Sequence, residues 1–137
     1  MNEVSDLGTA MASGTRFLVV DDFPTMRRII RLFLCDCGYT DIVEAADGQT
    51  ALAMLIAGEA DFLITDWNMP GISGLELLLE VRANPATQKL PVLMVSAETK
   101  HERIVEATRA GVDGYVIKPF TAQTLKHKID EILMSPR

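Results

Sequence analysis

Five short apolar runs, each followed by a segment with helical character, constrain the fold of this chain more than any other feature. Near-continuous apolar strands are typical of parallel sheets that helices cover on both faces. The sequence therefore predicts an α/β fold, a single doubly wound (βα)5 sandwich of three layers. The strands are expected at Phe17–Val20, Ile42–Ala45, Phe62–Thr65, Val92–Val95 and Gly114–Ile117.

The helices expected between these strands have start and stop residues of familiar kinds. Pro24 suits the first turn of a helix, and Gly38 suits the position just after the end of that helix. Thr99 and Glu102 have the spacing of a capping box, which predicts that a helix starts there. The other three helices are expected around residues 50–57, 75–84 and 121–134.

Length and charge limit the number of domains and the class of partner. A chain of 137 residues can bury the core of one domain. Its first residues are polar, small and aperiodic, which predicts a flexible N-terminal arm over 1–15 and a folded domain over 16–137. The net charge of −6 disfavours non-specific binding to nucleic acid.

Neither a membrane span nor a secretion signal is expected from this sequence. No window approaches about eighteen consecutive apolar residues, and Met1–Thr15 has neither a basic start nor an apolar core. A cytoplasmic location without membrane insertion is therefore expected. Cys35 and Cys37 stand two positions apart on a predicted helix, where side chains do not face each other, so both thiols are expected to be free.

Polar residues follow three of the predicted strands. Asp21 and Asp22 follow the first strand, Asp66 follows the third, and Lys118 follows the fifth. Such residues converge on the crevice where open α/β sheets bind ligands. Three carboxylates crowded there repel one another, so a divalent cation and a nearby ammonium would stabilise their ionised forms. The combination predicts a Mg²⁺-assisted phosphoryl site with Asp21 and Asp22 as candidate metal ligands.

Asp66 is the candidate phosphoacceptor, because a carboxylate can attack phosphorus to give an aspartyl phosphate. Lys118 would pair with Asp66 before the transfer and with phosphoryl oxygens afterwards. Ser96 ends the fourth strand and offers a hydroxyl donor to an incoming phosphoryl oxygen. Tyr115, on the fifth strand, is either a half-buried core aromatic or a side chain with two positions.

These residues resemble the signature of response-regulator receiver domains, the chemotaxis type in particular. The resemblance covers roughly residues 16–134. It rests on the aspartates named above, on Ser96-Ala97, on Lys118-Pro119-Phe120 and on the stretches 17–23, 25–29, 66–70, 91–95 and 114–116. It implies a flavodoxin-like fold with the parallel strand order 2-1-3-4-5, in which the first and third strands flank the ligand-binding crevice.

The resemblance also implies the metal ligands and the residue that is phosphorylated. Asp66 would be the phosphoacceptor. Asp22, Asp66 and the backbone carbonyl of Asn68 would bind Mg²⁺, and Asp21 would assist the metal through a water molecule.

The resemblance further implies which residues line the approach to the phosphoryl group and which residues respond to its presence. Ser96 and Lys118 would contact the group, and Ser96 and Tyr115 would form the switch that reports it. Asn68 and Glu98 would line the approach to the phosphate and are similar to the chemotaxis type, in which the phosphorylated state is short-lived. Ser96 replaces the threonine common in that type but keeps the hydroxyl.

The implied function is that of a monomeric, single-domain two-component response regulator rather than an enzyme, with self-catalysed phosphoryl transfer and dephosphorylation at most. A chemotaxis-type histidine kinase would phosphorylate Asp66, and the flagellar motor switch protein would be the target, with a phosphatase as a further partner. Thr99 and His101 differ from the small and basic residues of the motor-binding face. A phosphate sink or relay that does not bind the motor is therefore an alternative.

Two alternatives come from other classes of protein. A Mg²⁺-dependent phosphatase of the haloacid-dehalogenase type also uses an aspartyl nucleophile, but its second Asp two positions later is replaced here by Asn68, and no cap domain is evident. A flavin carrier on the same fold would need a phosphate-binding loop rich in Ser, Thr and Gly after the first strand. No such loop follows Val20.

Overall fold

Strands and helices alternate along residues 14–135, the part of the chain that this computed structural model describes. The strands are β1 (Phe17–Val20), β2 (Ile42–Ala45), β3 (Phe62–Thr65), β4 (Val92–Ser96) and β5 (Gly114–Ile117). The helices are α2 (Pro24–Asp36), α3 (Gly48–Ile56), α4 (Gly74–Ala83), α5 (His101–Arg109) and α6 (Ala122–Met134). The arm expected over 1–15 falls outside the described residues except for Gly14 and Thr15, so it stays a prediction.

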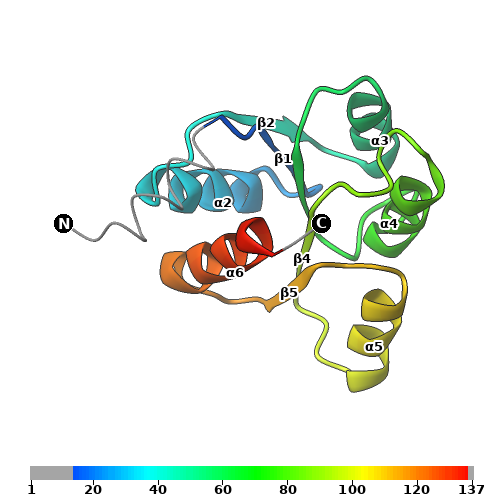
Figure 1. The fold of residues 1–137 in the computed structure, drawn as a ribbon. Helices are drawn as coiled ribbons and strands as arrows, with labels where there is room; N and C mark the ends of the chain where they lie inside the picture. Colours follow the sequence, from blue (N-terminus) through cyan, green and yellow to red (C-terminus); the bar gives the residue numbers. More distant parts are fainter. Residues whose placement is uncertain (1–13, 136–137) are drawn as a thin grey trace.

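The five strands form one parallel sheet in the order β2-β1-β3-β4-β5. Helices α2 and α6 cover one face, and α3, α4 and α5 cover the other (Figure 1). The expected three-layer α/β sandwich and its strand order 2-1-3-4-5 are confirmed. The carboxyl ends of all five strands consequently lie along one edge of the sheet.

Strand β1 shows how the sequence builds both halves of the core. Alternate side chains of a strand point to opposite faces. Phe17 and Val19 pack in the cluster beneath α2 and α6, and Leu18 and Val20 pack in the cluster beneath α3 and α4. All four are at most 1% exposed. An unbroken apolar run is therefore what a central strand with two covered faces requires.

The start of α5 differs from the sequence expectation. The helix begins at His101, and its N-cap residue Lys100 makes no side-chain capping hydrogen bond, so the expected capping box of Thr99 and Glu102 is wrong. The backbone N–H of Lys100 instead donates to the Glu98 carboxylate over 2.9 Å. This bond holds the segment after β4 in a non-helical turn and delays the start of the helix.

A capping box that the sequence analysis missed forms at α4. The Ser73 hydroxyl accepts from the backbone N–H of Glu76 over 3.1 Å, and the Glu76 carboxylate accepts from the backbone N–H of Ser73 over 3.0 Å. Gly74 follows at the first helical position, where a Cβ atom would lie 2.0 Å from the carbonyl oxygen of Asp66. Only glycine permits this approach, so the start of α4 packs directly against the end of β3.

Two further expectations concern the helices. Among residues 14–135, no helix is both long enough and apolar enough to cross a bilayer. Cys35 is exposed and Cys37 is half-buried, and both are free thiols as expected.

Candidate functional site

Three carboxylates meet where β1 and β3 end. Val20 is paired with Thr65 in the sheet, so Asp21 and Asp66 leave neighbouring strands at the same level. One carboxylate oxygen from each of Asp21, Asp22 and Asp66 lies within 4.8 Å of the other two. Asp21 and Asp66 are buried and Asp22 is half-buried. The structure thus brings together the three aspartates that the sequence placed at strand ends.

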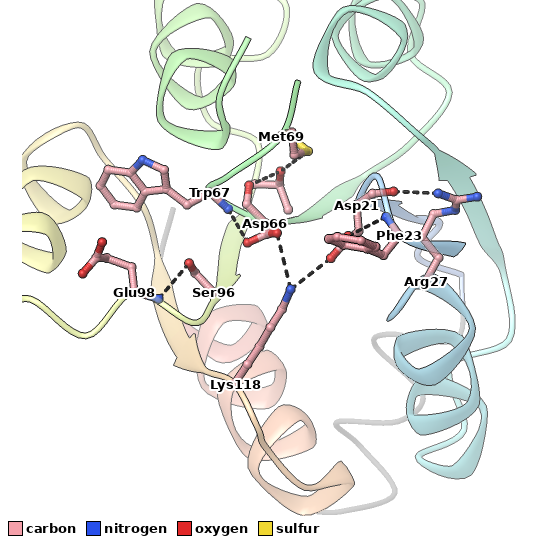
Figure 2. Close-up of polar contacts among 10 residues, drawn as sticks. Asp21, Phe23, Arg27, Asp66, Trp67, Met69, Ser96, Glu98 and Lys118 are labelled. Atoms are coloured by element: carbon pink, nitrogen blue, oxygen red, sulfur yellow. Dashed lines mark hydrogen bonds and ion pairs between the residues drawn. The ribbon is translucent and has the colours of Figure 1, made fainter. Parts of the chain in front are cut away.

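Lys118 reaches into this cluster from the end of β5 (Figure 2). Its Nζ atom lies 3.1 Å from Oδ2 of Asp21 and 3.4 Å from Oδ2 of Asp66. The expected pairing with Asp66 is present, and the shorter contact with Asp21 was not foreseen. Three carboxylates therefore face one ammonium in a largely buried crevice, which leaves an excess of negative charge.

Every acceptor group of Asp21 has a donor. Oδ1 accepts from the backbone N–H of Phe23 over 2.9 Å, Oδ2 accepts from Lys118, and the backbone carbonyl accepts from Nη1 of Arg27 over 2.6 Å (Figure 2). Asp22 is the opposite case. Its Oδ1 atom is the one buried side-chain oxygen or nitrogen without a hydrogen-bond partner among the described residues.

Asp66 is held in place by bonds to its carboxylate and to its backbone. Oδ1 accepts from the backbone N–H of Trp67 over 2.7 Å, and the Asp66 carbonyl accepts from the Thr65 hydroxyl over 2.9 Å. Burial raises the pKa of the Asp66 carboxyl above its usual range. The charge of Lys118 opposes that rise, and the charge of Asp21 adds to it. The protein alone therefore stabilises the ionised form of Asp66 less well than water does.

These residues fit a divalent cation with oxygen ligands. Mg²⁺ prefers carboxylate, carbonyl and water oxygens. Among residues 14–135 the buried Oδ1 of Asp22 has no hydrogen-bond partner, and a cation would offset the burial and the charge of Asp21, both of which disfavour ionised Asp66. Asn68, expected to contribute its backbone carbonyl, lies exposed in the loop between β3 and α4. Its part in the metal site stays a prediction.

The two residues of the expected switch converge on the backbone of Glu98. Ser96 is fully buried at the end of β4, and its hydroxyl accepts from the Glu98 N–H over 3.1 Å. The hydroxyl of Tyr115 donates to the Glu98 carbonyl over 3.0 Å. Tyr115 is half-buried against a cluster that includes Trp67 and Met94, and burial raises the pKa of its hydroxyl. The carboxylate of Glu98 is engaged by the backbone of the next turn rather than by the aspartates.

Two positioning contacts at the site were missed by sequence reasoning. The first is Arg27, whose Nη1 donates to the Asp21 carbonyl. A usable signal was present, because Glu44 near the end of the adjacent predicted strand can pair with it and hold it over the sheet edge. The second contact is the guanidinium of Arg103 on α5, whose central carbon lies 5.7 Å from the ring centroid of Trp67. No sequence pattern links those two positions.

Comparisons with known proteins agree with this geometry. The family model described as the response regulator receiver domain matches residues 17–130. The chain is 60% identical to the chemotaxis protein CheY of Pseudomonas aeruginosa over 117 residues, which are 85% of this chain and 94% of that protein. It is 56% identical to CheY-3 of Vibrio cholerae over 117 residues, 85% of this chain and 90% of that protein.

A solved structure supports the same assignment. The crystallised chemotaxis protein CheY4 of Vibrio cholerae is similar to this fold with a TM-score of 0.79 and 34% sequence identity, covering 86% of this chain and 98% of that one. Fold, strand-end residues and relatives therefore converge, and the chain belongs to the family of response regulator receiver domains, as a CheY-like member.

Proposed function

We propose that this chain is a single-domain response regulator that accepts a phosphoryl group on Asp66 from a histidine kinase in the presence of Mg²⁺. The observation that carries the proposal is the crevice at the ends of β1, β3 and β5. There the carboxylate of Asp66 faces two further aspartates and the ammonium of Lys118 within ion-pairing distance. Phosphoryl transfer needs a nucleophile, a positive charge near the transferred group and oxygen ligands for a divalent cation.

The proposed step is an in-line displacement at phosphorus. A carboxylate oxygen of Asp66 forms a bond to the phosphorus of a phosphohistidine, the P–N bond breaks, and its electron pair leaves with the imidazole nitrogen. Trp67 holds Oδ1 through its N–H, so Oδ2, the oxygen that faces Lys118, is the proposed nucleophile. Lys118 then neutralises charge on the transferred group.

The metal ligands are proposed to be Asp22, Asp66 and the Asn68 carbonyl, with Asp21 acting through water. The occupied acceptors of Asp21 and the partnerless Oδ1 of Asp22 support this division, because only the latter lacks a donor. When bound, Mg²⁺ supplies positive charge for the phosphoryl oxygens. Asp21 keeps Lys118 directed into the crevice through their ion pair.

The proposed switch is an exchange of partners at Ser96. Its hydroxyl accepts from the Glu98 N–H in this structure and would turn to donate to a phosphoryl oxygen. That exchange releases the segment between β4 and α5, to which the Tyr115 hydroxyl is bonded. Movement of Tyr115 would change the outer face formed by α5, β5 and α6. Only the difference in phosphoryl contacts between the two states can drive such a change.

The proposed output is chemotaxis signalling to the flagellar motor switch from the cytoplasm, as a monomer. The names and high identity of the relatives support a chemotaxis role. Asn68 and Glu98 are proposed to line the approach to the phosphate and to set its lifetime. A phosphate sink is the second candidate, which the departures at Thr99 and His101 favour.

Binding measurements distinguish these two outputs. The purified chain is first incubated with an autophosphorylated chemotaxis kinase and Mg²⁺, and transfer of the phosphoryl group to the chain is expected. Affinity for a motor switch protein is then measured with and without beryllofluoride, an acyl-phosphate mimic. A mimic-dependent gain in affinity supports the motor output. Transfer without any such gain indicates a sink, and failure of transfer from every kinase tested would contradict the proposal.

A further inference from the structure

We infer that Arg27 is a positioning residue for the acidic pair Asp21–Asp22 and thereby sets the affinity of the site for a divalent cation. This inference rests on the proposed function, because it concerns the metal site proposed there. Arg27 lies in the first turn of α2 and contacts the pair only through the protein backbone. Its effect on a bound cation would therefore be indirect.

The contact geometry is that of a fork with two acceptors. Nη1 of Arg27 donates to the backbone carbonyl of Asp21 over 2.6 Å, and Nε donates to the carboxylate of Glu44 over 3.0 Å (Figure 2 shows the first of these). The Arg27 side chain is only 17% exposed. A planar guanidinium can serve both acceptors at once, and a lysine ammonium at that place cannot reproduce the fork.

Glu44 gives this fork a fixed base. It lies in β2, paired in register with Val19 of β1. Its second carboxylate oxygen accepts from Nε of Arg31 over 2.8 Å, and Arg31 also donates to the carbonyl of Ile42 over 3.2 Å. Arg27 is therefore anchored to the sheet itself rather than to a mobile surface group.

The carbonyl that Arg27 holds determines the direction of Asp22. That oxygen belongs to the peptide group between Asp21 and Asp22, and the group is planar, so fixing the oxygen fixes the plane from which Asp22 departs. The Phe23 N–H bond to Asp21 Oδ1 closes the same turn from the other side. Oδ1 of Asp22, the one buried side-chain oxygen without a partner in the described part of the chain, thus departs from a peptide plane that Arg27 holds.

Charge and position predict opposite results when Arg27 is removed. A guanidinium near the crevice repels a divalent cation, so loss of its charge alone would tighten Mg²⁺ binding. Loss of the carbonyl bond would free the turn and weaken binding. Residues that orient a metal ligand without touching the metal typically change the metal affinity by about tenfold or more. The repulsion from the Arg27 charge should be the smaller effect, because that charge is already paired with Glu44. We therefore expect weaker binding.

The test is a Mg²⁺ titration of the full chain, in which binding is measured by Trp67 fluorescence and by calorimetry. Arg27→Ala and Arg27→Lys are each expected to raise the dissociation constant roughly tenfold. Arg28→Ala is the matched control, because it removes the same charge from an exposed position of the same helix and leaves Arg27, Glu44 and Arg31 in place. Its affinity is expected to stay within about twofold of the parent. All chains are compared at a temperature where thermal unfolding shows them folded.

A second readout does not depend on the metal. Hydrogen exchange of the Phe23 amide, measured by NMR without divalent cations, reports whether the turn is held, because that amide bonds Asp21. Exchange should accelerate in both Arg27 variants and not in Arg28→Ala. If the parent binds Mg²⁺ and Arg27→Ala binds it equally well or more tightly, the inference about Arg27 is wrong and the proposed metal site still stands. A parent that does not bind Mg²⁺ would overturn the proposed metal site and this inference with it.

Discussion

The hydroxyl of Tyr115 donates a hydrogen bond to the backbone carbonyl of Glu98 over 3.0 Å. The backbone N–H of Glu98 donates in turn to the hydroxyl of Ser96. One residue of the loop between β4 and α5 thus connects a fully buried serine beside the crevice to a half-buried aromatic on the outer face. A rearrangement of the Ser96 side chain can therefore reach Tyr115 through the backbone of a single residue, Glu98.

Ser96→Ala should separate phosphorylation from signalling. The substitution removes the hydroxyl but leaves Asp66 and the proposed metal ligands in place. We expect the variant to accept phosphoryl and to lose most of the phosphorylation-dependent gain in partner affinity, measured by titration of the target with phosphorylated chain. Ser96→Thr, which keeps the hydroxyl, should retain the gain. Equal target affinity for phosphorylated parent and phosphorylated Ser96→Ala would show that this hydroxyl is not the coupler.

Asp22→Ala should lower Mg²⁺ affinity severalfold or more, because it removes a buried oxygen that has no hydrogen-bond partner within residues 14–135. Quenching of Trp67 fluorescence during a Mg²⁺ titration is the measurement. Asp36→Ala is the control, since it removes one exposed acidic charge at the far end of α2. If both variants bind the metal as the parent does, the cation site lies elsewhere.

The raised pKa of Asp66 predicts how its stability contribution changes with pH. The Asp66 carboxyl binds its proton more tightly in the folded chain than in the unfolded chain. Ionisation of Asp66 therefore lowers the free energy of unfolding as pH rises from the ordinary carboxyl range through the raised pKa. At neutral pH without divalent cations, Asp66→Asn should therefore melt at a higher temperature than the parent. The difference should shrink as pH falls through that window. Thermal unfolding in a chelating buffer measures it, and a less stable Asp66→Asn at neutral pH would contradict the prediction.

The two thiols should react at different rates. Cys35 is exposed, whereas burial raises the pKa of the Cys37 thiol, which also donates to the carbonyl of Ala122. The thiolate is the reactive form, so an alkylating reagent should modify Cys35 first in the folded chain. Peptide mass spectrometry at short times measures this, with urea-unfolded chain as the control. Preferential labelling of Cys37 would mean that α2 and α6 separate readily.

The strands and the aspartate cluster could be predicted from the sequence because each depends on a regular rule. A central strand must be apolar on both faces, and residues that follow parallel strands share one edge of the sheet. The bond of Trp67 N–H to Asp66 follows no such rule, and the pairing of Arg27 with Glu44, which the sequence allows, does not predict the bond of Arg27 to the Asp21 carbonyl. Both bonds depend on the path of two loops. The capping box expected at Thr99 was wrong for the same reason, because a nearby loop bond shifted the helix start.

Covalent labelling tests the central claim, that Asp66 is the phosphoacceptor, most directly. The chain is incubated with a small phosphodonor and Mg²⁺, and the site is located by peptide mass spectrometry. One phosphoryl group, labile to base and to hydroxylamine, is expected on Asp66 and none on Asp66→Asn, because an amide is not a competent nucleophile. Undiminished labelling of Asp66→Asn would contradict the assignment.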